Sequence, residues 1–184
     1  MKKLITITGC TSSGKTLIQD AVVRVNDNIS KIVSTTSRPI RINEKESIDY
    51  YYISRAVAIE MLAFNEFIEC RKYDVIDLAG SNTWYYGISK EDCIDNAVVV
   101  VEPHGFRQLA QMDGINVISF YIKVDERERL IRMVKRGDNL LEVFRRIFSD
   151  QGVFQFIDQE VDWVIDNNQN INDSVNKIIE FINF

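Results

Sequence analysis

The sequence is poor in the residues that build metal centres. Among its 184 residues are one histidine and three cysteines. Cys10, Cys70 and Cys93 share none of the spacings that zinc ligands use, and His104 stands alone. These shortages exclude a structural zinc site. An odd number of scattered cysteines favours reduced thiols, so we expect a cytoplasmic protein.

The sequence also lacks an excess of positive charge and a long apolar run. Its 22 Lys and Arg residues are outnumbered by 27 Asp and Glu residues, which gives a net charge of −5. A general nucleic-acid binder needs a basic face against phosphates, so that class is excluded. The apolar run in the opening MKKLITITG is about five residues long, too short for a signal peptide or a membrane span. We therefore expect neither a nucleic-acid polymer nor a membrane as a partner.

Proline is scarce too, with two residues, whereas 46% of the residues are hydrophobic. This composition is typical of a folded protein with one substantial core. Apolar strands alternate with stretches of helical spacing, which predicts an α/β fold with a parallel sheet covered on both faces. Strands are expected at 3–8, 31–36, 49–53, 67–71, 97–102, 116–124 and 162–167, and helices at 15–25, 54–64, 89–95, 104–112, 125–136, 140–156 and 171–183.

One motif points to nucleotide chemistry. The stretch GCTSSGKT follows the first predicted strand and matches the P-loop pattern, GxxxxGK followed by Ser or Thr. The glycines let backbone amides wrap around phosphate oxygens, and the following helix adds its positive N-terminus. Lys15 is predicted to bridge the β- and γ-phosphates, and Thr16 to hold Mg²⁺ through its hydroxyl. The predicted residues of this triphosphate site are Gly9, Cys10, Thr11, Ser12, Ser13, Gly14, Lys15 and Thr16.

Two other classes of P-loop protein fit less well. A switch GTPase needs a guanine-reading NKxD element, but NKII at 176–179 lacks the Asp and lies in a predicted helix. A motor-type ATPase usually ends a core strand with an Asp at the metal, whereas AVVVVE ends in Glu102. The ATPase class is weakened without being excluded, and the P-loop alone indicates a bound nucleoside triphosphate and not its fate.

A second cationic segment, STTSRPIR, places Arg38 and Arg41 around Pro39 in an otherwise acidic chain. Taken alone, the two arginines are an ordinary pair of solvated loop cations. A kinase that phosphorylates a phosphate must, however, hold a second anion, and the planar fork of Arg suits that task. The proline keeps the segment out of a regular helix, so both forks can address one anion.

The run STTSRPIRINEKESIDYYY resembles the monophosphate-binding segment of guanylate kinases, in which Thr-Thr-Arg-x-x-Arg leads to a Glu and then to Asp-Tyr. The resemblance continues over nearly the whole chain, through FIE (67–69), WYYGIS (84–89), VEPHG (101–105), RMVKRG (132–137) and VIDNN (164–168). It implies a three-layer P-loop fold with a monophosphate-binding insertion and a lid. It also implies transfer of the ATP γ-phosphoryl group to GMP or dGMP with Mg²⁺, giving GDP or dGDP.

The resemblance assigns roles residue by residue. Glu69 matches the carboxylate that reads guanine through N1–H and the exocyclic amine, and Asn167 matches an Asn beside the ATP base. The acceptor phosphate is assigned to Ser34, Arg38, Arg41, Tyr50 and Tyr86. Glu44, Ile88 and Glu102 stand at further acceptor-side positions of the family pattern.

The predicted lid is rich in arginine. Arg129, Arg132 and Arg136 fall on one helical face at i, i+3 and i+7. For Arg129, a solvated position paired with Glu126 and Glu128 is an open alternative, whereas Arg132 and Arg136 match lid arginines of the family. They are expected to offset charge in the transition state together with Lys15 and with Arg146 or its neighbour Arg145.

Three departures from the family pattern surround the acceptor base and the metal. Val100 and Glu102 stand where guanylate kinases usually have Asp-x-Asp, and Ile88 stands where Ser or Thr is common. The path from Glu69 to Tyr86 is longer than usual. His104 occupies a usual Gln position and is interpreted as structural. Phosphoryl transfer is therefore better supported than the choice of base or of ribose over deoxyribose.

We expect a single domain that acts as a monomer or homodimer. Its predicted parts are a core (1–33, 89–125 and 147–184), a monophosphate-binding region (34–88) and a lid (126–146). Two alternatives stay open: a related kinase for another (d)NMP or a sugar phosphate, and a non-catalytic interaction module with a guanylate-kinase-like fold. The intact Lys15 and Thr16 disfavour the module.

Overall fold

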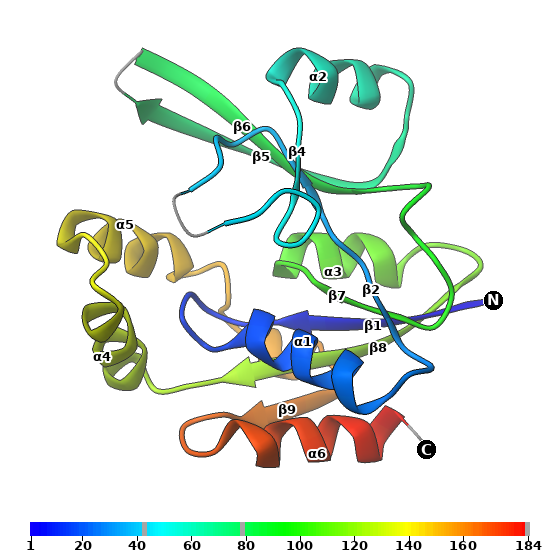
Figure 1. The fold of residues 1–184 in the computed structure, drawn as a ribbon, viewed down its shortest axis with the longest axis vertical. Coiled ribbons are helices and arrows are strands. Elements are labelled where there is room, and N and C mark those ends of the chain that lie inside the picture. The colour runs from blue at the N-terminus through cyan, green and yellow to red at the C-terminus, as the bar shows by residue number, and fades with distance from the viewer. Residues whose placement is uncertain (42–43, 78–79, 183–184) are drawn as a thin grey trace.

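The computed structural model describes residues 1–41, 44–77 and 80–182 (Figure 1). Its core is a five-stranded parallel sheet in the order β2-β7-β1-β8-β9. The strands are β1 (Lys2–Thr8), β2 (Ser30–Lys31), β7 (Ala97–Val100), β8 (Ile115–Lys123) and β9 (Trp163–Asp166). Because the strands are parallel, their carboxyl ends meet at one edge, and the P-loop leaves the sheet at that edge.

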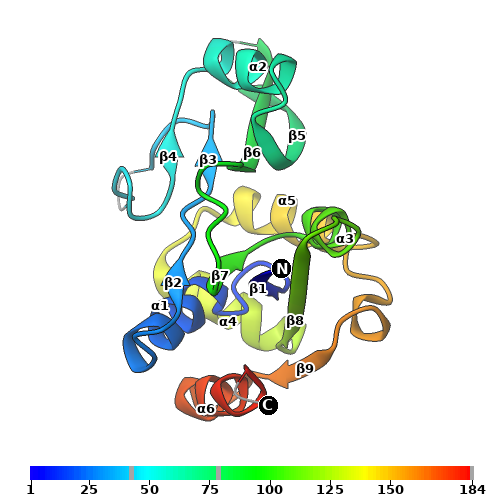
Figure 2. The same cartoon turned by 90° about the vertical axis from the view of Figure 1, so that its right-hand side faces the viewer.

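Helices cover both faces of this sheet, which confirms the three-layer α/β prediction (Figures 1 and 2). On β1, Ile5 and Ile7 face one side, while Leu4 faces the other. The first side is covered by α1 (Lys15–Val25) and α6 (Ile171–Ile182), and the second by α3 (Pro103–Ala110). The central strand is thus buried on both faces, as its continuous apolar sequence predicts.

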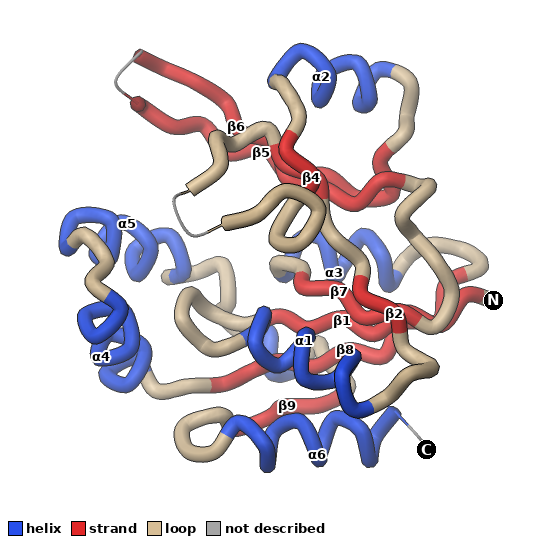
Figure 3. The backbone as a smooth tube through the Cα atoms, in the orientation of Figure 1, coloured by secondary structure: helices blue, strands red, loops and turns tan. Residues whose placement is uncertain are grey.

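A second sheet lies on the opposite side of the core from α6 (Figures 2 and 3). Its order is β4-β3-β6-β5, with β3 and β4 parallel and the other pairs antiparallel. Its elements are β3 (Thr35–Thr36), β4 (Tyr51–Tyr52), β5 (Phe67–Asp77) and β6 (Gly80–Ser89), with α2 (Arg55–Ala63) beside them. The β5–β6 hairpin is the longest element of this sheet.

Two helices, α4 (Glu126–Arg136) and α5 (Leu140–Asp150), lie beside the P-loop end of the core (Figure 1). They pack on each other through Leu130, Met133, Val143 and Ile147. The Asn139 side chain accepts hydrogen bonds from the amides of Leu141 and Glu142 and so caps α5. A short 3-10 turn (Ile157–Gln159) then leads towards β9.

Several predicted elements differ from the observed ones. The expected helix at 89–95 is wrong: β6 runs to Ser89, and a turn follows in which Ser89 Oγ donates to Asp92 at 2.7 Å. The expected helix at 140–156 ends at Asp150, because Gln151 is extended. The single strand expected at 31–36 is two short strands, β2 and β3, in different sheets.

Candidate active site

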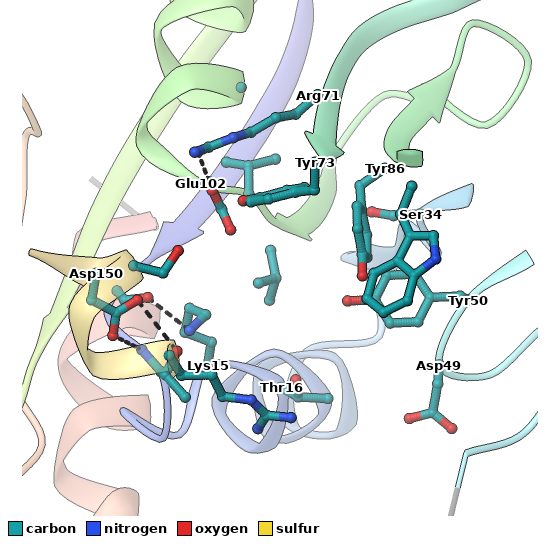
Figure 4. Close-up of a pocket in the computed structure, with 18 of the residues that line it drawn as sticks. Lys15, Thr16, Ser34, Asp49, Tyr50, Arg71, Tyr73, Tyr86, Glu102 and Asp150 are labelled. Atoms are coloured by element: carbon teal, nitrogen blue, oxygen red, sulfur yellow. Dashed lines mark hydrogen bonds and ion pairs between the residues drawn. The ribbon is translucent and has the colours of Figure 1, made fainter. Parts of the chain in front are cut away.

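One cavity of about 480 Å³ brings together segments that are far apart in the sequence. Lys15, Thr16 and Asp150 lie on one side of it, Ser34, Tyr50 and Tyr86 on another, and Arg71, Tyr73 and Glu102 on a third (Figure 4). The predicted site residues that line it are Gly9, Thr11, Ser12, Lys15, Thr16, Ser34, Arg41, Glu44, Tyr50, Glu69, Tyr86, Glu102, Arg136 and Arg146. Donor-side and acceptor-side residues therefore share one space.

The P-loop turns tightly between β1 and α1. Gly14 has φ 93°, and a Cβ at this position would lie 2.8 Å from Nδ2 of Asn167. The amide of Ser13 donates to the carbonyl of Cys10 at 3.2 Å, and Ser12 also has a positive φ of 64°. Both the backbone conformation and the lack of space require glycine at position 14. This is the wrapped backbone that anion-binding loops use.

Lys15 is held inside this loop. Its Nζ donates to the carbonyl oxygens of Gly9 at 2.7 Å and Cys10 at 3.0 Å. Burial lowers the pKa of Lys15, and the negative charge of Asp150 acts in the opposite direction. The ammonium group therefore sits at the donor end of the cavity, next to Thr16 at the start of α1.

Asp150, which sequence reasoning missed, ties the end of α5 to the P-loop. Its Oδ2 accepts from the amide of Thr11 at 2.8 Å and pairs with Arg129 at 3.1 Å. Arg129 is 6% exposed and also donates to the carbonyl of Thr11 at 3.4 Å. The alternative kept open for Arg129, a solvated side chain paired with nearby glutamates, is wrong: the side chain is buried and its partner is Asp150. Only the three-dimensional structure could reveal this pair, since 21 residues separate its members.

On the acceptor side, Arg38 is buried against a carboxylate. Its Nη2 donates to Glu44 Oε1 at 2.8 Å, and the hydroxyl of Tyr52 donates to Glu44 Oε2 at 2.7 Å. Burial alone would raise the pKa of Glu44, but the hydrogen bonds from Arg38, the Arg41 amide and Tyr52 lower it to about 2. Arg41, in contrast, is exposed and lines the cavity directly. Arg38 therefore braces the segment, while Arg41 offers an accessible guanidinium.

Three tyrosines form an aromatic wall above this segment. Tyr50 and Tyr73 each meet Tyr86 edge to face, with ring centroids 6.0 and 5.4 Å apart. Burial raises the pKa of Tyr50 to about 12, so its hydroxyl keeps its proton at neutral pH. Neutral hydroxyl donors next to guanidinium groups suit a doubly charged phosphate.

Glu69 lies deep in the cavity wall and is 8% exposed. A Cβ on Gly105, in the first turn of α3, would lie 2.6 Å from Glu69 Oε2, so only glycine leaves room for this carboxylate. Burial, and then the negative charge of Glu102, raise the pKa of Glu69 to about 7. A buried carboxylate that still lines the cavity is suited to accept hydrogen bonds from a bound ligand.

Two residues that were predicted to contact a ligand do not line this cavity. Ile88 is fully buried in the cluster under α3 and does not line the cavity, although it is two residues from Tyr86 on β6 and directly opposite Glu69. Asn167 is also buried: its Nδ2 donates to the carbonyl of Ser13 at 2.8 Å, and its Oδ1 accepts from Ser174 at 3.0 Å. In this structure Asn167 supports the P-loop from behind and does not face the cavity.

The lid arginines are paired with acidic residues of the lid itself. Arg136 pairs with Asp138, and Arg146 pairs with Glu142 at 2.9 Å. Both arginines line the cavity, as does Arg145, so the choice between Arg145 and Arg146 stays open. Arg132 lies outside the lining and donates to the carbonyl of Asn167 at 2.8 Å. The catalytic roles assigned to these residues stay predictions.

Comparison with known protein families agrees with this arrangement. The family model described as "Guanylate kinase" matches residues 1–184, the whole chain. The chain belongs to the guanylate kinase family.

Curated relatives carry the same name. A guanylate kinase from Prochlorococcus marinus subsp. pastoris is 25% identical over 188 residues, which cover 99% of this chain and 97% of that protein. A guanylate kinase from Mycoplasma pneumoniae is 29% identical over 144 residues, or 74% of this chain, and the match spans 57% of the length of that relative. The family resemblance therefore extends along the chain at low identity.

A solved structure matches as well. The crystal structure of guanylate kinase from Anaplasma phagocytophilum has a TM-score of 0.68 at 23% identity, covering 99% of this chain and 85% of that one. At this identity the match establishes the guanylate kinase fold and leaves the roles of single residues to the geometry described above.

Proposed function

We propose that this protein transfers the γ-phosphoryl group of ATP to GMP or dGMP, giving ADP and GDP or dGDP. The observation that carries the proposal is the shared cavity, in which the P-loop lysine and the acceptor-side cations line one space. Membership of the guanylate kinase family and the names of the relatives support the choice of acceptor.

Charge and position are proposed to do the chemistry. Lys15 and the P-loop amides hold the donor phosphates, while Ser34, Arg41, Tyr50 and Tyr86 hold the acceptor phosphate. Arg132, Arg136 and Arg146 neutralise the negative charge that develops between the donor and acceptor phosphates during transfer. Neither a covalent intermediate nor a dedicated general base is required.

The residues at the donor end fit a magnesium ion. Thr16 offers a hydroxyl and Asp150 offers a carboxylate on the same side of the cavity. Oxygen ligands of this kind suit Mg²⁺, which is commonly held by one or two protein groups together with substrate phosphates. Within the described residues no group of three Asp, Glu, His or Cys side chains could hold a metal alone. Bound there with ATP, the ion would neutralise phosphate charge.

The predicted core, monophosphate-binding region and lid are proposed to move as separate parts. Arg136 and Arg146 are paired with Asp138 and Glu142, so closure over both nucleotides would exchange these carboxylates for phosphate oxygens. Closure would also exclude water and limit wasteful ATP hydrolysis.

The proposed function includes a compartment and an oligomeric state. We propose a cytoplasmic monomer or homodimer whose partners are small nucleotides. The acidic net charge of −5 supports the absence of a nucleic-acid polymer among them. Over the described ranges, the helices are too short or too polar to cross a membrane.

The proposal is tested by supplying purified protein with ATP and Mg²⁺ and with a panel of ribo- and deoxynucleoside monophosphates, reading ADP formation. Selective turnover with GMP or dGMP is the expected result. Turnover with another base would support the rival kinase. Failure with every nucleotide and sugar phosphate would remove the kinase assignment and favour the interaction module.

A further inference from the structure

Strand alternation places a cation beside the carboxylate that is expected to read the base. Glu69 and Arg71 are two residues apart on β5, so their side chains leave the same face of the second sheet. Both line the cavity. On β6, Tyr86 lies directly opposite Arg71 in the antiparallel pairing, and it also lines the cavity. The hairpin thus presents a carboxylate, a guanidinium and an aromatic ring to the cavity.

The guanidinium of Arg71 is held in place at the edge of the cavity by two neighbouring side chains. Nη1 pairs with Glu102, the N-cap residue of α3, and Cζ lies 4.6 Å from the centre of the Tyr73 ring (Figure 4). Its side chain is 26% exposed. In the described part of the chain, the other N–H groups of this guanidinium have no protein partner. The guanidinium of Arg71 is therefore held in a fixed position and has further N–H donors available for a ligand.

Glu69 and Arg71 together complement the hydrogen-bonding groups of guanine. Guanine carries two donors, N1–H and the exocyclic amine, next to two acceptors, O6 and N7. A carboxylate complements the donors, and an arginine fork complements the acceptors. Adenine reverses the polarity at position 6 and carries no hydrogen on N1. Ile88 is buried away from the cavity and offers no side-chain donor to O6.

We infer that Arg71 is a specificity-determining residue that donates hydrogen bonds to O6 and N7 of the acceptor guanine, alongside Glu69. This inference rests on the proposed function and extends it to the choice of base. Glu102 then acts as a positioning residue, because its carboxylate orients the guanidinium. The long β5–β6 hairpin has a purpose in this account: it carries Arg71 and Tyr73 to the cavity wall.

Two purine analogues separate the roles of the two side chains. IMP lacks the exocyclic amine and tests the Glu69 side, whereas 7-deaza-GMP lacks the N7 acceptor and tests the Arg71 side. The measurements are equilibrium binding and kcat/KM for GMP, IMP and 7-deaza-GMP, at a pH well above the pKa of Glu69. The variants are Arg71→Ala and Glu69→Gln. Lys72→Ala is the matched control, since Lys72 is an exposed cation on the opposite face of β5.

For the unmodified protein we expect about 10-fold weaker use of 7-deaza-GMP than of GMP, the loss of one charge-assisted hydrogen bond. Arg71→Ala should lower kcat/KM for GMP by about 10- to 100-fold and bring the two acceptors to equal use. The Glu69→Gln variant should keep discrimination at N7 and lose discrimination against IMP. Lys72→Ala should leave unchanged both the ratio of kcat/KM for GMP to that for 7-deaza-GMP and the ratio of kcat/KM for GMP to that for IMP.

If Arg71 serves only to hold Glu102, Arg71→Ala will lower kcat/KM for GMP and for 7-deaza-GMP by the same factor. That result would show that the inference is wrong. Equal binding of GMP and 7-deaza-GMP by the unmodified protein would also overturn it. Failure of the proposed function looks different: the protein would transfer phosphate to none of these purines, whatever residue stands at position 71.

Discussion

The donor and acceptor sides of the cavity differ in what supplies their charge. On the donor side, backbone amides and one buried lysine form a loop that is fixed to the core sheet and supported by Asn167. On the acceptor side, the charges are side chains, and carboxylates already pair with them: Glu44 with Arg38, and Glu102 with Arg71. The donor side is therefore a rigid, local structure, while the acceptor side is a network whose members depend on one another.

This difference predicts that the largest single loss follows removal of the donor cation. Lys15→Met should lower kcat by about 10³-fold or more, because no other side chain at the P-loop can replace a charge that acts on the transferred group. Stability should hold or rise, since burial already disfavours the charged lysine. Steady-state kinetics and thermal unfolding measure the two effects, with Lys90→Met, an exposed lysine, as the control. More than a tenth of the original activity would contradict the prediction.

Breaking the acceptor network should cost both binding and stability. Arg38→Met should raise KM for GMP by about 100-fold and lower the free energy of unfolding by about 3 kcal/mol, because Glu44 is left half-buried without its partner. Arg41→Met removes a cation that is 47% exposed, so it should raise KM for GMP with a stability loss below about 1 kcal/mol. Neither change should alter KM for ATP. Equal stability losses in the two variants, read by denaturant unfolding, would show that the pair with Glu44 is unimportant.

Two carboxylates of the acceptor side should respond to pH in opposite ways. The pKa of Glu44 is lowered from 4.5 to about 2. Its contribution to stability is therefore fully present above pH 4.5 and is lost as the pH falls from 4.5 to about 2. The pKa of Glu69 is raised to about 7, so the folded protein keeps a proton that the unfolded chain releases. Stability is then lost as the pH rises from the ordinary value, near 4.5, to about 7.

Substrate use should rise where this stability falls, because only the ionised Glu69 accepts from guanine. Between about pH 6 and pH 8, kcat/KM for GMP should increase about 10-fold. Glu69→Gln should lower kcat/KM, remove this rise and stabilise the protein at alkaline pH by about 2 kcal/mol. The exposed neighbour Glu66 supplies the control variant, Glu66→Gln. A pH profile that survives in Glu69→Gln would assign the titration to another group.

The difference between the donor and acceptor sides also explains which parts of the site could be predicted from the sequence. The P-loop is a local pattern of glycine, lysine and threonine between a strand and a helix, so eight adjacent residues were enough to place the donor side. The parallel core followed from apolar strands alternating with helices. Arg38 and Arg41 stood out as two cations around Pro39, but the family resemblance was needed to assign them to the acceptor phosphate and to find Glu69.

The rest depended on register and on distant contacts. Along β5, Arg71, Tyr73 and Val75 alternate with Cys70, Lys72 and Asp74, which gives no clear apolar face, so the strand was expected to stop at 71. Nothing in the sequence showed that Ile88 belongs to the buried cluster under α3. Asp150 reaches the P-loop only because α4 and α5 fold against each other.

The smallest effect is expected where the last residue of α5 touches the donor loop. Asp150→Asn keeps the shape of the side chain but weakens its hold on the Thr11 amide and leaves Arg129 without its charged partner. KM for ATP should rise about 5-fold, the loss of part of one charge-assisted hydrogen bond, with KM for GMP unchanged. Asp158→Asn, at an exposed position, is the control. A larger change in KM for GMP than for ATP would place Asp150 on the acceptor side.

The claim that one cavity joins donor to acceptor is tested most directly by phosphorus NMR of the protein with ATP, Mg²⁺ and GMP. We predict that ADP and GDP appear in equal amounts, and that almost no ADP forms when GMP is left out. Release of ADP with inorganic phosphate, at a rate that GMP does not change, would contradict the account.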